Sequence, residues 1–122
     1  MNWVLVGLGG ALGSMARYGT TLAAARIFGS PVPYATAIVN ILGCAVIGIL
    51  AGAAAAGPAR FSPEMRALVF TGILGGFTTF SAFGLDTVTL VAGGRGGQAA
   101  LNVLLQVVLG LGAAFVGYTL AK

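Results

Sequence analysis

Two adjacent glycines and three hydroxyl side chains interrupt an apolar segment that runs from Ala67 to Ala92. The interruption is the stretch Gly75-Gly-Phe-Thr-Thr-Phe-Ser-Ala-Phe83. Inside a membrane, backbone that leaves the helix is tolerated only where protein buries it or where it lines a polar cavity. The carbonyl and amide groups of such broken helices often bind ions. This stretch therefore predicts a membrane protein that handles a small ion.

The polar side chains near this stretch are hydrogen-bond donors suited to an anion. Asn40 lies inside the apolar run Ala37–Gly43, and its amide can donate two hydrogen bonds. Thr79 and Ser81 could each offer a hydroxyl hydrogen to an anion. The alternative for Asn40 is a bond to a carbonyl of a neighbouring helix. The alternative for the hydroxyls is a bond to the carbonyl four residues earlier.

Two aromatic rings and one arginine could also contact an anion. Phe80 and Phe83 are spaced to share one face of a helix, and the edge of an aromatic ring is its positive part. Packing is the alternative role for both rings. Arg17 lies well inside an apolar segment, where a charge is costly unless it reaches the interface or finds partners. It could attract anions or cap carbonyls of a neighbouring helix.

The elements that must position these residues are membrane-spanning helices. The chain is 58% hydrophobic and only 7% charged, with a mean hydropathy of +1.03. A soluble domain usually carries roughly 25% charged residues. Segments of about 20 apolar residues can each cross a bilayer. We expect one all-α transmembrane domain, residues 1–122, with its third helix broken at mid-membrane and with four spans: Trp3–Ala25, Tyr34–Ala56, Ala67–Ala92 and Gln98–Ala121.

Composition also argues against several classes of function. The six basic residues are too few and too scattered for a nucleic-acid surface. The chain has no histidine, one cysteine, Cys44, and no nucleotide-binding loop, catalytic triad or cluster of zinc ligands, so we do not expect an enzyme. A proton-coupled exporter of the small multidrug type would need an acid at mid-membrane. Asp86, the one acid inside a span, falls towards the end of that span.

The distribution of basic residues bears on the orientation of the chain. Four spans place both termini on one side. The basic residues divide almost evenly: Arg60, Arg66 and Lys122 lie on the side of the termini, and Arg26, Arg95 and Arg17 lie on or near the other. An excess of Lys and Arg on one side normally sets orientation. Its near absence predicts insertion both ways round and an antiparallel homodimer, unless a single basic residue is enough to orient the chain.

Three motifs resemble those of the fluoride channels of the Fluc or CrcB type. Gly75–Phe83 resembles the signature of the third helix in that family. Gly9–Tyr18 resembles its first-helix motif, and Ala37–Gly43 resembles its second. The resemblance extends in order over essentially the whole chain. It implies a dual-topology homodimer with two pores, which passively exports cytoplasmic fluoride through a plasma membrane of bacterial type.

The resemblance also implies roles for individual residues. Asn40 and the hydroxyls of the broken helix would line the fluoride path, with the ring edges of Phe80 and Phe83 facing the ion. A structural sodium ion would be bound by the backbone carbonyls of Gly75 and Thr78. Arg17 would serve structure, or attract anions near a vestibule.

The chain departs from the pattern of that family at four positions. Ala82 stands where the motif usually has threonine, and Asp86 stands near a common glutamate. Asn102 stands where some members carry tyrosine, and Gln106 where a small hydroxyl residue is expected. Gln106 could replace that hydroxyl as a donor on the fluoride path, or partly fill the pore. A pore closed by Gln106 would make the chain a non-conducting subunit or the partner of a second gene product.

Overall fold

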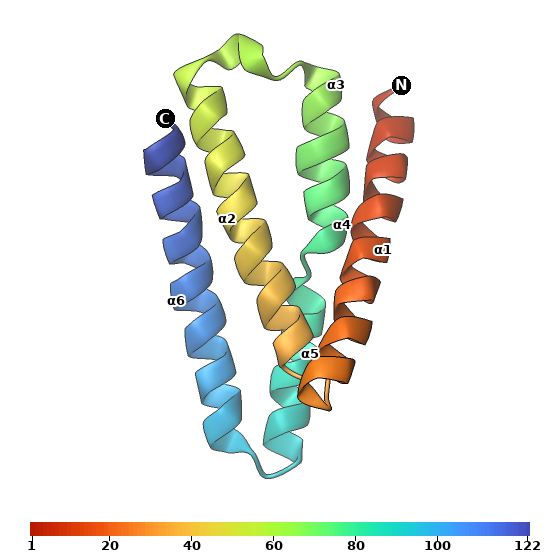
Figure 1. The fold of residues 1–122 in the computed structure, drawn as a ribbon, viewed down its shortest axis with the longest axis vertical. Helices are drawn as coiled ribbons and strands as arrows, with labels where there is room; N and C mark the ends of the chain where they lie inside the picture. Colours follow the sequence, from red (N-terminus) through yellow and green to blue (C-terminus); the bar gives the residue numbers. More distant parts are fainter.

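The computed structural model describes residues 1–122 as a bundle of long helices without strands (Figure 1). The second expected span has the boundaries expected for it, and the others begin or end within a few residues of their expected limits. The N- and C-termini lie at the same end of the bundle (Figure 1). The elements are α1 (Asn2–Phe28), α2 (Tyr34–Ala56), η1 (Pro58–Arg60), α3 (Pro63–Arg66), η2 (Ala67–Leu74), α4 (Gly75–Phe77), α5 (Phe80–Ala92) and α6 (Gly96–Ala121).

Three helical stretches are long and apolar enough to cross a membrane. They are Tyr34–Ala56, Pro63–Ala92 and Gly96–Ala121, with mean hydropathies of 2.3, 1.6 and 2.1. α1 is not among them, although it is 27 residues long. Its sequence contains Arg17 and several glycines, which lower its apolar character. The expectation of membrane-spanning helices is thus confirmed for three of the four segments.

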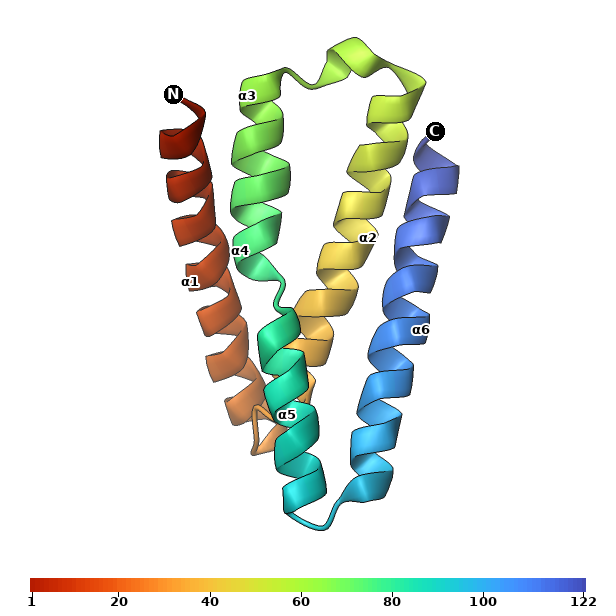
Figure 2. The same cartoon turned by 180° about the vertical axis from the view of Figure 1, so that it is seen from behind.

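The helix that carries the third apolar segment is interrupted at two threonines (Figure 2). Thr78 has φ −80° and ψ 157°, and Thr79 has φ −155° and ψ 119°, which is extended backbone. The interruption lies within the stretch Gly75–Phe83, as the sequence predicts, but it does not fall at the two glycines of that stretch. Gly75 is helical, with φ −63° and ψ −36°, and α4 continues through both glycines. A β-carbon on Gly76 would collide with the backbone of Gly10 in α1, so this glycine serves close helix packing.

Threonine is suited to the position where helical geometry resumes. The Oγ1 atom of Thr79 accepts a hydrogen bond of 3.2 Å from the backbone amide of Ala82. This is an N-cap, in which a side-chain oxygen satisfies one of the amides that the first turn of a helix leaves without a partner. Because of this cap, α5 can begin at Phe80 directly after the extended residue Thr79.

Small residues bring the helices together in two pairs. α1 packs against η2 and α4, where a β-carbon on Gly9 or Gly13 would collide with backbone atoms. α2 packs along α6, where Gly48 and Gly52 face the backbone of Ala114 and Tyr118 in the same way. These four glycines therefore serve close helix packing. Such contacts allow backbones to approach closely in lipid, where van der Waals packing replaces the hydrophobic effect.

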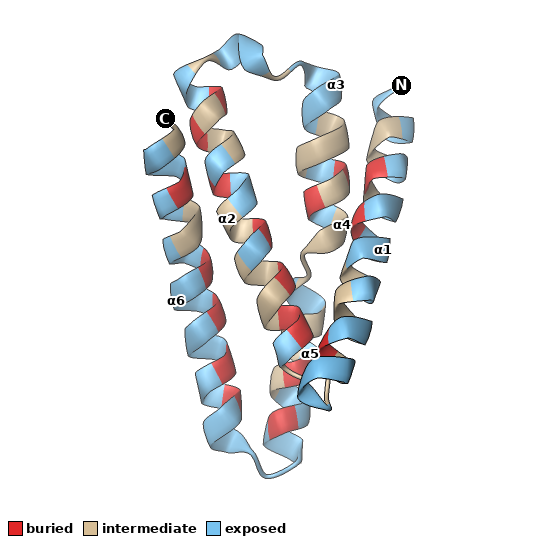
Figure 3. Cartoon of the chain, viewed as in Figure 1, coloured by how far each residue is buried: buried red, intermediate tan, exposed pale blue.

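The protein interior is thin. Only 19 of 122 residues are buried, and they form narrow stripes along the facing sides of the helices (Figure 3). Large apolar side chains such as Trp3, Leu85 and Leu120 are largely exposed. A water-soluble monomer rarely exposes so much contiguous apolar surface. This outer surface therefore suits lipid or another apolar chain.

Candidate functional site

The extended residues between α4 and α5 are held by one side chain from α2. The amide nitrogen Nδ2 of Asn40 donates to the carbonyl of Thr79 at 3.0 Å, and Asn40 Oδ1 accepts from the Thr79 amide at 2.8 Å. The carboxamide thus satisfies both backbone groups of a residue that belongs to no helix. The alternative considered for Asn40, a bond to a backbone carbonyl outside its own helix, is thus present in the structure. Contact between Asn40 and an ion stays a prediction.

We call the two hydrogen bonds between Asn40 and the backbone of Thr79 the clamp on Thr79. This clamp leaves carbonyl groups at the interruption without their usual helical partners. In a continuous helix the Thr79 amide would bond to the carbonyl of Gly75, but here it donates to Asn40. Likewise the Ala82 amide would bond to the carbonyl of Thr78, but here it donates to Thr79 Oγ1. The carbonyls of Gly75 and Thr78, for which the family resemblance implies a sodium ion, are therefore released from their usual helical partners. Carbonyl oxygens of unwound helix are suitable ligands for Na⁺.

A hydrogen-bonded chain extends from Asn40 across to α6 and back to α5. Asn40 Nδ2 donates to Gln106 Oε1 at 2.8 Å, and Gln106 Nε2 donates to Asn102 Oδ1 at 2.8 Å. Asn102 Nδ2 donates to Thr87 Oγ1 at 3.2 Å, and that hydroxyl donates to the carbonyl of Phe83 at 2.8 Å. Asn102 and Gln106 are buried. Each group in the chain donates to the next, an arrangement in which neighbouring bonds reinforce one another.

Sequence reasoning did not place Asn102 in the site. Two carboxamides four positions apart in an apolar helix are the signal that could have identified it, because they lie on one helix face. The sequence predicts that Gln106 is either a donor on the fluoride path or a side chain that partly fills the pore. In the structure its oxygen faces Asn40 and its nitrogen faces Asn102.

A groove with a volume of about 460 Å³ lies between α2, the η2–α4 segment, α5 and α6. We call it the central groove. Its apolar wall includes Ile47, Phe70, Leu74 and Leu111. The structure brings most of the residues predicted for ion binding to this groove: Asn40, Gly75, Thr78, Thr79, Phe80, Phe83 and Gln106. Ser81 and Arg17 do not line it.

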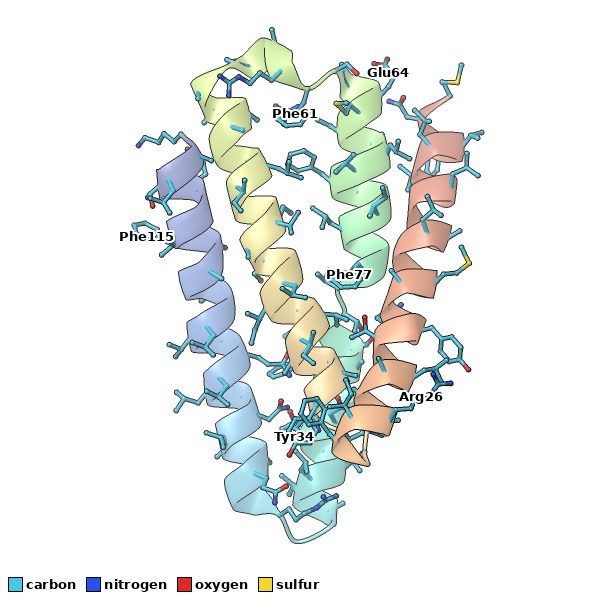
Figure 4. The ribbon with its side chains drawn as sticks, in the orientation of Figure 1. Arg26, Tyr34, Phe61, Glu64, Phe77 and Phe115 are labelled. Atoms are coloured by element: carbon cyan, nitrogen blue, oxygen red, sulfur yellow. The ribbon has the colours of Figure 1, made fainter.

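The aromatic pair stands at the start of α5. The ring centroids of Phe80 and Phe83 are 5.5 Å apart, with the ring planes inclined at 45°. Phe80 is 83% exposed although it lines the groove, whereas Phe83 is half-buried. Phe77, at the end of α4, lies beside the interruption, while Phe115 points outward from α6 (Figure 4). Phe80 thus lines the groove although the rest of this chain leaves most of its ring uncovered.

A second cavity, of about 270 Å³, lies on the side of α1. We call it the Arg17 cavity. Its polar lining comes from Ser14, Arg17, Thr21, Thr36 and Thr79. Nε of Arg17 is buried and has no hydrogen-bond partner, so the capping of a neighbouring carbonyl expected for Arg17 is not made by this atom. Thr79 lines both cavities and is the point where they approach each other.

The hydroxyl groups of Thr78, Thr79 and Ser81 differ in their hydrogen-bond partners. Thr78 Oγ1 donates to the carbonyl of Leu74 at 2.9 Å, in the preceding turn of the helix. Thr79 Oγ1 instead lies 3.2 Å from Ser81 Oγ. Ser81 is exposed and lies outside both cavities. The Thr79–Ser81 pair therefore adds hydroxyl groups at the rim of the interruption.

A buried acid joins α5 to α2. The hydroxyl of Thr36 donates to Asp86 Oδ2 at 2.6 Å, and both residues are buried. Sequence reasoning found Asp86 but not its partner, since the two residues are far apart in the chain. The contact anchors the helix that begins just after the interruption.

Comparison with known proteins identifies the family. Residues 4–118 match the family model described as CrcB-like protein, Camphor Resistance (CrcB). The chain is 48% identical to the "Fluoride-specific ion channel FluC" of Methylobacillus flagellatus, over 98% of this chain and 93% of that protein. It is 42% identical to "Fluoride-specific ion channel FluC 2" of Nitrobacter hamburgensis, over 100% and 98% of the two chains. The homologous protein of Cereibacter sphaeroides, "Fluoride-specific ion channel FluC", is 46% identical over 92% and 87%. With its span-forming helices and a match over nearly its full length, the chain is a multi-pass membrane protein that belongs to the CrcB-like family.

Proposed function

We propose that this chain forms a fluoride-selective channel through which cytoplasmic fluoride leaves the cell passively. The observation that carries the proposal is its 48% identity, over 98% of the chain, with a protein named as a fluoride-specific ion channel. Hydrogen fluoride crosses lipid and dissociates at neutral pH, so the trapped anion needs an exit. The chain would therefore act as a conduit in the inner (plasma) membrane and not as an enzyme.

The path for fluoride would pass Thr79, where the Arg17 cavity and the central groove approach each other. Arg17 would attract anions into its cavity, because its buried Nε has no partner within the chain. Ser81 and Thr79 would supply hydroxyl hydrogens, and Asn40 one amide hydrogen, in place of water. Gln106 and the ring edges of Phe80 and Phe83 would complete the lining. Conduction requires contacts strong enough for entry and weak enough for exit, which neutral donors provide.

The membrane arrangement that we propose has four spans, with α1 as the additional one. Its 27 residues correspond to about 40 Å of helix, more than the roughly 30 Å hydrocarbon core. The extended residues Thr78 and Thr79 would then lie near the middle of the bilayer. Irregular backbone at that depth is tolerated because Asn40 satisfies the groups of Thr79.

Two copies would assemble as an antiparallel homodimer. The balanced distribution of Lys and Arg supports insertion in both orientations. The thin interior and the uncovered ring of Phe80 in the central groove support a second chain as a cover, because Phe80 is 83% exposed. Cysteine labelling from each side of the membrane would test this arrangement. We expect a cysteine placed at Ser62, in the loop between α2 and α3, to react from both sides.

A structural sodium ion would bind at the centre of that dimer through the carbonyls of Gly75 and Thr78. These carbonyls fit a hard cation because the amides that would normally bond to them are directed to Asn40 and Thr79. The bound ion would fix the interruption without permeating. We expect that replacing sodium with a larger organic cation weakens the dimer or its flux. Identical dimerisation and flux in both salts would remove the sodium site.

The test of the function is efflux of fluoride from liposomes that hold the purified protein. A fluoride electrode reads the efflux, an ionophore carries potassium as counter-ion, and chloride serves as the control anion. We expect rapid loss of fluoride while chloride is retained. A folded dimer that releases no fluoride would instead support a non-conducting subunit or a chain that requires a second, different partner.

A proton-coupled exporter is the second candidate, because Asp86 is a buried acid within an apolar helix. An exporter would require a proton gradient and an ionisable side chain at that position. A channel would conduct without the gradient. Fluoride efflux that is equal with and without a pH difference across the liposome membrane would exclude the exporter.

A further inference from the structure

The carboxamide of Asn40 has no amide hydrogen left for an ion. One hydrogen of Nδ2 is donated to the carbonyl of Thr79 and the other to Gln106 Oε1. The bond to Thr79 is part of the clamp on the interruption, which a second bond from the Thr79 amide reinforces. The bond to Gln106 joins two side chains that both line the central groove. It is the one that can open without disturbing the backbone.

The orientation of Gln106 is set by Asn102. Because Gln106 Nε2 donates to Asn102 Oδ1, only the oxygen of the glutamine carboxamide faces Asn40. Asn102 is in turn held by the hydroxyl of Thr87. Gln106 is 8% exposed and Asn102 is 4% exposed, so water does not readily compete for these bonds. Gln106 Oε1 in this position would repel a passing anion, and it would also occupy the Asn40 amide hydrogen that the anion could bind.

We propose that Gln106, positioned by Asn102, is a latch that competes with fluoride for the amide of Asn40. The inference rests on the proposed function and describes the regulation of the same site. In the closed state Gln106 Oε1 accepts the hydrogen bond from Asn40 Nδ2 that fluoride would otherwise accept. The ion takes its place when the glutamine side chain turns away, because a hydrogen bond to an ionised acceptor is roughly twice as strong as a neutral one. The clamp on Thr79 stays in place throughout.

The latch has a measurable effect on the concentration dependence of flux. When only a fraction of the molecules is competent to bind, the apparent dissociation constant rises by the inverse of that fraction. One neutral hydrogen bond shifts such an equilibrium by roughly two- to tenfold. Removing the latch should therefore lower the fluoride concentration for half-maximal flux by roughly two- to tenfold.

The test is the substitution Gln106→Met, which keeps the length and flexibility of the side chain but removes its amide. We expect the half-saturating fluoride concentration to fall roughly two- to tenfold relative to the unaltered channel. Leu105→Met is the matched control, since this exposed neighbour on α6 takes no part in the network. An unchanged or higher half-saturating concentration in Gln106→Met overturns the latch and leaves Gln106 as a space-filling residue or a ligand.

The positioning role of Asn102 has a separate test. Asn102→Leu removes the anchor of Gln106 without touching Asn40, and should lower the half-saturating concentration in the same direction. In a Gln106→Met background the same substitution should have no further effect, since residues of one network are not additive. An equal effect in both backgrounds would show that Asn102 acts on packing alone, and would overturn its assignment as a positioning residue.

A flux-independent measurement separates failure of the latch from failure of the channel. Nuclear magnetic resonance of the ¹⁵N-labelled side-chain amide of Asn40 reports its two hydrogens individually. In Gln106→Met one of them should move upfield, as it loses its acceptor, while the Leu105→Met spectrum stays unchanged. Unchanged Asn40 resonances in Gln106→Met overturn the latch. Absence of fluoride flux in every folded variant, with the expected shift present, overturns the channel function and not the latch.

Discussion

Replacement of Asn40 by alanine tests how the interruption between α4 and α5 is maintained. The side chain makes two bonds to the backbone of Thr79, of 3.0 Å and 2.8 Å. Alanine leaves both the amide and the carbonyl of Thr79 without these partners. It also releases Gln106, whose oxygen then loses its donor. The same substitution removes a donor from the proposed fluoride path.

The magnitude follows from the groups left without a partner. A buried donor or acceptor without a partner costs about 1–3 kcal/mol. For the Thr79 amide alone, that cost corresponds to exchange with solvent that is faster by roughly 5- to 150-fold. The amide and carbonyl together lower the local stability of the interruption by about 2–6 kcal/mol. The effect should be confined to the residues around Thr79, because the helix pairs themselves keep their contacts.

The assay is hydrogen–deuterium exchange at the Thr79 amide, measured in lipid nanodiscs, together with fluoride efflux. Asn2→Ala is the control, because it removes the same group from the exposed start of α1. We expect faster exchange at Thr79 and lower fluoride flux in Asn40→Ala, and neither in Asn2→Ala. Exchange at Thr79 within twofold of the unaltered rate would refute the clamp. Unchanged flux would remove Asn40 from the fluoride path.

Three further substitutions test other parts of the argument. Phe80→Ile should slow or stop fluoride conduction because it removes a ring edge from the groove, whereas Phe115→Ile, on the outward side of α6, should conduct normally in the same efflux assay. Gly13→Ala should lower the free energy of unfolding by about 1–3 kcal/mol in a detergent denaturation experiment, since its β-carbon would collide with the backbone of Ile73. Gly7→Ala, which meets open space, should have no such effect, and equal stability of the two variants would contradict this packing argument. Asp86→Asn should retain fluoride flux, because a channel needs no proton carrier, and abolished flux in a folded dimer would support the exporter.

Local sequence patterns were sufficient to predict the class of fold and most of the residues around the groove. Tyr34–Ala56 is an apolar run with a turn at each end, so both of its ends could be predicted. Membrane helices are recognised by length and hydropathy alone. The polar residues Asn40 and Thr79 stood out because polar groups are costly in an apolar segment. Those signals depend on the residues themselves, so the sequence contains them without reference to the fold.

The position of the interruption could not be predicted in the same way. The glycines and hydroxyl residues of Gly75–Phe83 predict an interruption within that stretch, but they do not specify the residue at which it falls. Packing against α1 instead keeps Gly76 helical, because only glycine allows the backbones to approach there. The interruption falls at Thr78 and Thr79, where Asn40 from α2 and the hydroxyl of Thr79 replace the helical bonds. Tertiary contacts thus overrode local propensity.

Residue types and their order along the chain are enough to predict an all-α membrane protein with neutral donors and aromatic rings near an interruption in its third apolar segment. The partners of those donors depend on how the helices pack. The helix packing joins Gln106 to Asn40 and Asp86 to Thr36, from helices far apart in the chain, and Asn102 orients Gln106 from within α6. Hydrogen bonds of side chains have short range and strict geometry, so their partners depend on the relative placement of helices. That placement follows from the packing of small residues along whole helices, which no local pattern specifies.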